Sequence, residues 1–158
     1  MLRYVGDSNN LRNRVRQHCN GNIESSALRK TIAKEMGFEI VKSIRPSGSR
    51  KISLKSDHYE QVVSDYIQSG NWRVITCPSG EYAREFQWYA IDLLRPQLNK
   101  YMQFWNTDSE DEFGNLLTLL QDSSIIPFAS TLEIAKLPGV YSLWHERSPA
   151  EFANDASA

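Results

Sequence analysis

Arg14 and His18 are the side chains near the N-terminus whose types and spacing could act on a phosphate. They lie four residues apart in a segment with helical spacing, so both face the same side of a helix. A guanidinium group binds a phosphate through two parallel charge-assisted hydrogen bonds, and a neighbouring histidine can donate to the same phosphate or carry a proton. Taken alone, the stretch is more typical of an ordinary surface helix that carries three arginines.

Two short patterns of glycine and tyrosine lie at opposite ends of the chain. Tyr4-Val5-Gly6 places a tyrosine near the end of a predicted strand, where glycine allows a tight turn and the close approach of a ligand to the backbone. Gly139-Val140-Tyr141 begins another predicted strand. Each pattern is weak alone, because a tyrosine in a strand usually packs in the core.

Glu85 lies inside a long predicted helix beside aromatic residues. A carboxylate in such surroundings is either paired with a cation or holds a metal ion, and Mg²⁺ takes only one or two protein carboxylates. A surface position is nevertheless the commonest role of a helical glutamate. Asn99, which follows Pro96, caps a turn or orients a phosphate.

Together these stretches resemble the GIY-YIG nuclease family, which is named for two strand motifs that pair as a hairpin. Gly139-Val140-Tyr141 and Tyr4-Val5-Gly6 correspond to the two motifs, with Val in place of Ile in both. In the family an arginine and often a histidine follow the second motif, and Arg14 and His18 stand at those offsets. A glutamate on a later helix and a Pro-x-x-Asn ending match Glu85 and Pro96 to Asn99.

The resemblance implies a metal-dependent endonuclease that hydrolyses DNA phosphodiester bonds with Mg²⁺ or Mn²⁺. Glu85 would hold the metal ion, Tyr141 or Tyr4 would position or deprotonate the attacking water, and Arg14 would stabilise the charge on the phosphate. His18 would assist by a hydrogen bond or proton transfer, and Asn99 is a weaker assignment. The cations expected to track DNA are Arg12, Arg16, Arg29, Lys30, Arg45, Arg50 and Lys51.

The order of the motifs differs from that of the family, where the Gly-Ile-Tyr strand comes first. We therefore expect a circular permutation in which Gly139 to Trp144 pairs antiparallel with Leu2 to Val5. A loop from Glu146 to Ser157 would then stand in the position of the family's short connection. The alternative is a fragment of a longer chain, cut inside one copy of the domain.

The elements expected to position these residues mix strands with covering helices. This pattern predicts an α+β fold with a small central antiparallel or mixed sheet flanked by helices. A flexible basic loop is expected from Arg45 to Ser56. The predicted strands span 2–5, 38–44, 72–77 and 139–144; the helices span 11–18, 26–36, 59–68, 81–94 and 115–121, with a short helical or irregular approach at 132–137.

Length and composition fit one soluble domain of 158 residues, with a core in 1–101 and 138–146 and a connecting segment in 102–137. Cys19 and Cys77 are expected to be free buried thiols of a cytoplasmic protein, and no stretch is apolar enough to span a membrane. Residues 1–55 carry twelve cations and four acids, whereas 101–158 carry two cations and nine acids. The basic segment is the expected footprint of a polyanion.

Two other functions compete with the nuclease. A DNA-binding module of the same fold would keep the basic surface without cutting. A protein-interaction domain would use the acidic segment 106–112, which is more typical of an exposed linker. No helix-turn-helix or zinc finger is appended, so specific cleavage would need the helix from Ser25 to Met36 or a homodimer.

Overall fold

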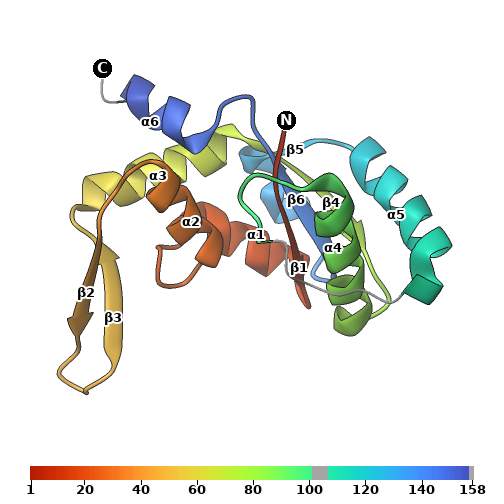
Figure 1. Ribbon diagram of the computed structural model, residues 1–158, viewed down its shortest axis with the longest axis horizontal. Helices are drawn as coiled ribbons and strands as arrows, with labels where there is room; N and C mark the ends of the chain where they lie inside the picture. Colours follow the sequence, from red (N-terminus) through yellow and green to blue (C-terminus); the bar gives the residue numbers. More distant parts are fainter. Residues whose placement is uncertain (101–106, 157–158) are drawn as a thin grey trace.

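The central feature of the computed structural model, which describes residues 1–100 and 107–156, is a four-stranded sheet (Figure 1). Its strands are β1 (Leu2–Ser8), β6 (Gly139–Trp144), β4 (Asn71–Thr76) and β5 (Ile126–Pro127), in that spatial order. All three neighbouring pairs are antiparallel. Helices flank this sheet, which confirms the predicted α+β class.

The strands that carry the two glycine–tyrosine motifs lie side by side, as predicted. β1 pairs antiparallel with β6, and Gly6 stands opposite Tyr141. A Cβ atom on Gly6 would come within 2.3 Å of the Tyr141 hydroxyl oxygen, so only glycine leaves room for this ring. The glycine of one motif thus makes the space that the tyrosine of the other motif fills.

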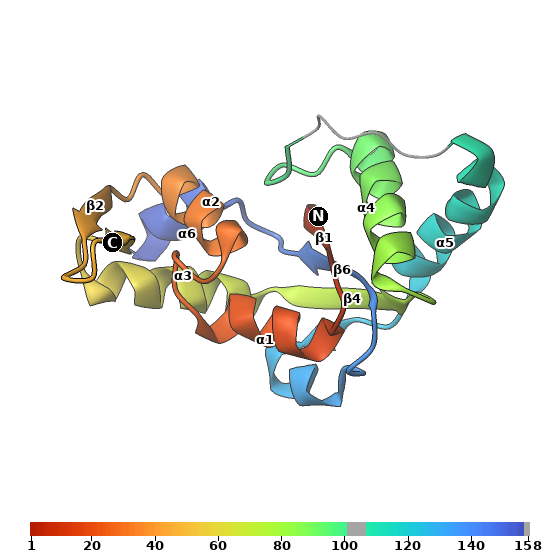
Figure 2. The ribbon, with the colours of Figure 1, turned by 90° about the horizontal axis from the view of Figure 1, so that it is seen from below.

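Helices cover the sheet on two sides (Figures 1 and 2). One hydrophobic cluster joins Tyr141 and Leu143 to α1 (Leu11–Asn20), α2 (Ala27–Glu35) and α3 (Asp57–Ser69). The other joins Val140 to α4 (Gly80–Leu94) and α5 (Glu110–Asp122). Alternate residues of β6 therefore enter opposite clusters, as the period of a strand requires.

The predicted helices and strands are present, with ends that differ from the predictions by a few residues. Short polar side chains cap four of the helices by accepting a backbone N–H bond in the first turn. These capping residues are Asn10 for α1, Ser26 for α2, Ser56 for α3 and Ser79 for α4.

The prediction of a flexible loop from Arg45 to Ser56 is wrong, because residues 50–54 form one strand of a second, two-stranded sheet. β2 (Ile40–Ile44) and β3 (Arg50–Leu54) pair antiparallel into a ribbon that projects from the body (Figure 1). Gly48, with a φ of +87°, allows the turn between the strands. Ile52 and Leu54, two positions apart in β3, pack on the core while Lys51 and Lys55 are exposed, which fixes the register.

The C-terminal part also holds more regular structure than expected. The predicted loop from Glu146 to Ser157 contains α6 (Pro149–Ala156), whose Phe152 packs edge-on against Tyr66 and His145. Within the expected linker 106–112, residues 107–109 form a 3₁₀ turn, and the acids 110–112 form the first turn of α5. Carboxylates are favourable at a helix N-terminus. Asn106 lies outside the described residues, as do residues 101–105 before it. A second 3₁₀ helix spans Phe128–Glu133.

Cys19 and Cys77 are both free and buried, as predicted. Among the helices of residues 1–100 and 107–156, none is long and apolar enough to cross a membrane.

Candidate active site

A chain of polar side chains runs through the space between β6, α1 and α2. The Nε2 atom of His18 lies 2.7 Å from the hydroxyl oxygen of Tyr141, and its Nδ1 atom lies 2.6 Å from the hydroxyl oxygen of Ser26. All three side chains are buried. Tyr4 extends the chain toward the surface, because its hydroxyl group hydrogen-bonds to that of Tyr141. These four residues are called the relay below.

The start of α2 fixes the inner end of the relay. Ser26 is the N-cap of α2 and accepts a hydrogen bond from the backbone N–H of Arg29 at 3.1 Å. The guanidinium group of Arg29 is fully buried and donates to the carbonyl oxygen of His18 and to the carboxylate of Glu60 at 3.0 Å. A buried cation held by several acceptors tolerates little movement, so Arg29 ties α1, α2 and α3 around His18.

Arg14 brings positive charge to the outer end of the relay. Its side chain is half-buried, hydrogen-bonds to Tyr141 and also donates to the side-chain oxygen of Gln17. Its charge lowers the pKa of both Tyr4 and Tyr141, although burial, the larger influence, raises the pKa of each hydroxyl. The predicted proximity of Arg14, His18 and the two tyrosines is therefore present in the fold.

Burial keeps His18 neutral. The pKa of His18 lies well below its usual value because the ring is desolvated, and the charges of Arg14 and Arg29 lower it further. A neutral imidazole is an acceptor on one nitrogen and a donor on the other. In the tautomer with the proton on Nδ1, Nε2 accepts a hydrogen bond from Tyr141 and can take its proton.

Asn99 contacts the backbone of β1. Its Oδ1 atom accepts from the backbone N–H of Val5 at 2.8 Å, and its Nδ2 atom donates to the Val5 carbonyl at 2.9 Å. The backbone N–H of Leu98 donates to the backbone carbonyl oxygen of Arg3. The segment after α4 therefore covers the outer edge of β1, which would otherwise present free backbone groups.

A pocket of about 230 Å³ lies beside Tyr4. It is lined by Tyr4 of β1, by Ala27 and Thr31 of α2, by Gln87 and Ile91 of α4, and by Leu98, Asn99 and Lys100. Glu85 is half-buried on α4 and does not line this pocket. A helix turns by about 100° per residue, so positions 85 and 87 face directions about 200° apart.

The donor set of this pocket does not fit the metal ion that the resemblance implies. Mg²⁺ binds through at least one carboxylate in most protein sites, and none of the described lining residues carries one. Elsewhere in residues 1–100 and 107–156, no group of three or more His, Cys, Asp or Glu side chains could hold a metal ion. Asp7, at the end of β1, instead feels the charges of Arg84 and Arg14.

The cations expected to contact DNA occupy very different environments. Arg29 lies in the core, as described above, and is out of reach of a nucleic acid in this conformation. Arg12 donates to the carbonyl oxygen of Ile134, and Arg16 donates to the hydroxyl group of Thr131. Lys30 is half-buried. The contacts of Arg12 and Arg16 hold α1 to the segment before β6, although parts of both side chains stay accessible.

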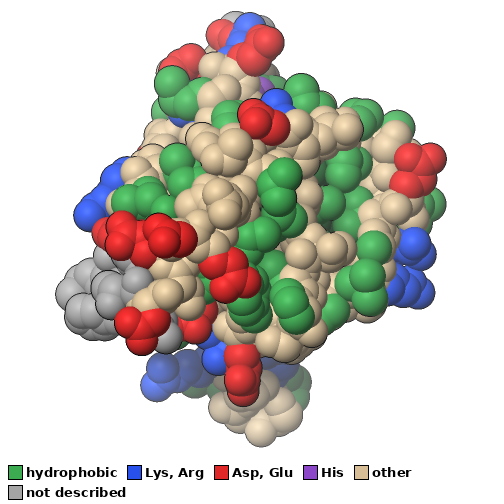
Figure 3. All heavy atoms as spheres, turned by 90° about the vertical axis from the view of Figure 1, so that its right-hand side faces the viewer, with side chains coloured by type: hydrophobic (Ala, Val, Ile, Leu, Met, Phe, Trp, Pro, Cys, Tyr) green, Lys and Arg blue, Asp and Glu red, His purple; other side chains and the backbone are tan. Residues whose placement is uncertain are grey.

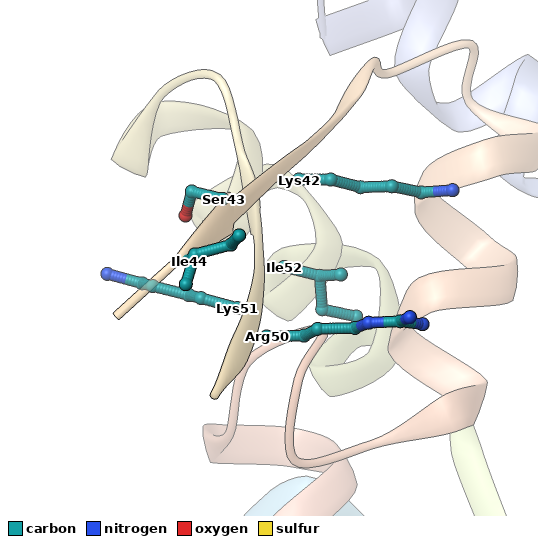
Figure 4. Close-up of a pocket in the computed structure, with 6 residues that line it drawn as sticks. All are labelled: Lys42, Ser43, Ile44, Arg50, Lys51 and Ile52. Carbon is teal, nitrogen blue, oxygen red and sulfur yellow. The ribbon is translucent and has the colours of Figure 1, made fainter. Parts of the chain in front are cut away.

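The β2–β3 ribbon presents the more accessible cations. Arg50 and Lys51 are exposed, as is Lys42, which was not among the predicted DNA contacts. Lys42 and Arg50 extend from one face of the ribbon, and Lys51 extends from the other (Figure 4). Arg45, at the turn, forms an ion pair with Glu24, which also accepts from the backbone N–H of Ile52 at 2.9 Å.

Two residues of the site were not predicted as site residues. Ser26 stands at the start of a predicted helix, and its sequence position gives no sign that it reaches His18. Gln87 has no charge to distinguish it from other helical residues. The position of Ser26 depends on how α2 packs beside α1, and that of Gln87 on how α4 packs against β1.

The comparison with protein families agrees with this geometry. Residues 1–75 match the family model described as the GIY-YIG catalytic domain. Comparisons with curated proteins and with solved structures gave no match. The matched segment contains Tyr4, Arg14 and His18, and β1 carries one of the two motifs that name the family. Residues 1–75 of this chain are therefore similar to a GIY-YIG catalytic domain.

Proposed function

We propose that this protein is an endonuclease that hydrolyses phosphodiester bonds in DNA. The proposal is carried by one observation, the buried contact of 2.7 Å between His18 and Tyr141 with Arg14 beside it. A neutral imidazole bonded to a tyrosine hydroxyl can accept a proton, and a guanidinium group can offset the charge that develops on a phosphate. These are two of the tasks of phosphodiester hydrolysis; the third is to stabilise or protonate the leaving oxygen.

The relay gives the proton a route away from the attacking water. Tyr4 is its most accessible member and lines the pocket. The water gives a proton to the Tyr4 oxygen as Tyr4 gives its own proton to Tyr141, and Tyr141 in turn gives one to Nε2 of His18. Each hydroxyl group ends neutral, which matters because burial raises the pKa of both tyrosines. His18 ends protonated, and its lowered pKa makes this a transient state. Arg14 stabilises the pentavalent phosphate.

The β2–β3 ribbon is the proposed DNA contact, since its width suits the major groove. Lys42, Arg50 and Lys51 supply the charge that phosphates attract. The face seen in Figure 3 carries mainly apolar and acidic side chains, with cations near its edges. Charge therefore favours the ribbon side for DNA, and a homodimer would double the contact.

The test is the conversion of supercoiled plasmid to nicked or linear DNA with Mg²⁺, with Mn²⁺ and with EDTA. The wild type is expected to nick the plasmid. The same assay tests the predicted metal role of Glu85: loss of metal-dependent nicking in Glu85→Ala supports it, and full activity removes it. Absence of nicking under every condition, on plasmid and on branched DNA, would contradict the endonuclease.

A DNA-binding module without cleavage is the second candidate, and one observation favours it. The pocket beside Tyr4 lacks the carboxylate that the family's metal chemistry leads one to expect. This candidate predicts retarded migration of a DNA duplex in a gel together with intact plasmid. Nicking by the wild type excludes it.

We also propose that the motif order reflects a circular permutation. Support comes from β6, a strand near the end of the sequence that lies between β1 and β4 and is antiparallel to both. A chain rearranged to start before Pro138, with Ala158 joined to Met1 through a short linker, is expected to fold and to bind DNA as the original does. Failure of the rearranged chain to fold with several linkers would contradict the permutation.

A further inference from the structure

We infer that the pocket beside Tyr4 binds a phosphate group, with Gln87 as the ligand from α4, and is not a divalent-metal site. That the phosphate belongs to a nucleic acid rests on the proposed function. The preference of the pocket for an anion does not, because it follows from the side chains that line it.

The lining residues offer hydrogen-bond donors that are not used within the protein. The side-chain amide of Gln87 makes no hydrogen bond to any other residue that the structure describes, and neither does the ammonium group of Lys100. Asn99 uses one of its two amide N–H groups on Val5, which leaves the second. Five or more N–H groups thus border a space of about 230 Å³.

The charge of the lining residues also favours an anion. Among the described residues that line the pocket, Lys100 is the only charged one. A phosphate binds through N–H and O–H donors and a nearby cation, whereas Mg²⁺ needs oxygen ligands with negative charge. A lysine beside two amides therefore attracts an anion and repels a divalent cation.

Two residues of α4 show which face of the helix borders the pocket. Gln87 and Ile91 lie one turn apart, and both line the pocket. The preceding turn of the same face carries Arg84, whose charge acts on Asp7 at the end of β1. Glu85 would need a rotation of the helix by about 160° to reach the position of Gln87, and the buried Phe86 opposes such a rotation.

The experiment compares Gln87→Glu with Glu85→Gln, two variants that exchange an amide and a carboxylate two positions apart. Inorganic phosphate is titrated while the side-chain amide resonances of Gln87 and Asn99 are followed by NMR. Mn²⁺ alone is titrated while the free ion is followed by electron paramagnetic resonance. Neither measurement uses DNA or cleavage.

Phosphate is expected to shift the Gln87 amide resonance in the wild type and in Glu85→Gln. Gln87→Glu should weaken phosphate binding at least about tenfold, because a carboxylate repels the anion, and should strengthen Mn²⁺ binding about tenfold. Lys100→Gln, an exposed change that leaves the core intact, should weaken phosphate binding without strengthening Mn²⁺ binding.

Three results would overturn the inference. Phosphate could leave both amide resonances unmoved, Lys100→Gln could bind phosphate as the wild type does, or Glu85→Gln could abolish tight Mn²⁺ binding of the wild type. Phosphate binding without DNA cleavage would remove the endonuclease but keep this pocket. DNA cleavage without phosphate binding would remove the phosphate pocket but keep the endonuclease.

Discussion

The relay and the β2–β3 ribbon hold their polar side chains in opposite ways. In the relay, Tyr141 and His18 are almost fully buried, and each has a partner at hydrogen-bond distance. On the ribbon, Lys42 and Lys51 extend into solvent from two short strands. Burial gives a fixed geometry at the cost of desolvation, whereas exposure gives charge that can adapt to a partner. The first suits chemistry, and the second suits binding.

Replacing His18 should separate the two regions most strongly. His18→Gln removes the proton acceptor and is expected to lower the rate of DNA cleavage about 100-fold to 10,000-fold, while DNA binding stays near the wild type. Single-turnover cleavage and a binding titration measure the two effects. His58→Gln, an exposed histidine of α3, is the matched control. An equal loss of activity in both variants would contradict a role in the relay.

The ribbon should show the reverse pattern. The triple variant Lys42→Gln, Arg50→Gln and Lys51→Gln removes three cations and is expected to lower the slope of log K against log salt by about 2.7 units. The melting temperature should not change, because all three side chains are exposed. Lys136→Gln, outside the ribbon, serves as the control. An unchanged slope in the triple variant would move the DNA contact elsewhere.

Alanine substitutions at two glycines allow the packing around the relay to be compared with that around an ordinary helix. Gly6→Ala places a methyl group 2.3 Å from the Tyr141 hydroxyl oxygen and should lower the free energy of unfolding by about 1–3 kcal/mol. Gly114→Ala, in α5, meets only the Tyr89 hydroxyl at 3.4 Å and should be neutral or stabilising. Chemical denaturation measures both. Equal stability of the two variants would mean that Tyr141 is not tightly held.

The pH dependence of stability should report the buried histidine. The folded-state pKa of His18 is lowered, so the unfolded chain binds a proton first as the pH falls below about 6.5. Stability should fall with decreasing pH by up to about 1.4 kcal/mol per pH unit from this residue. His145, whose pKa burial also lowers, adds in the same direction. His18→Gln should flatten the dependence below pH 6.5; an unchanged profile would mean that His18 is charged in the fold.

The sequence predicted the sheet better than it predicted the ribbon. Gly139–Trp144 carries a continuous apolar pattern with glycine at its start, and its bounds were predicted correctly. β3 was missed because Arg50 and Lys51 are cations and Ser53 is polar, so Ile52 and Leu54 alone carried the alternation. α6 was missed because its helical pattern is short and follows a serine and a proline that also fit a loop.

For the site, local spacing brought Arg14 and His18 to one side of α1, but it did not reveal tertiary contacts. Arg29 looked like a surface cation until the fold placed Glu60 beside it. Glu85 was selected by its charge, whereas the pocket beside Tyr4 contains Gln87. Both differences arise from helix orientation, which depends on packing across the whole core and cannot be deduced from short stretches.

The most direct test of the relay is the cleavage rate of Tyr141→Phe, which removes one oxygen atom and keeps the ring. Tyr59→Phe, a half-buried tyrosine that stacks on Phe38 outside the relay, is the control. Single-turnover cleavage of a labelled DNA duplex should fall at least about 100-fold in Tyr141→Phe and stay unchanged in Tyr59→Phe. Wild-type cleavage by a folded Tyr141→Phe protein would show that the contact between His18 and Tyr141 has no part in catalysis.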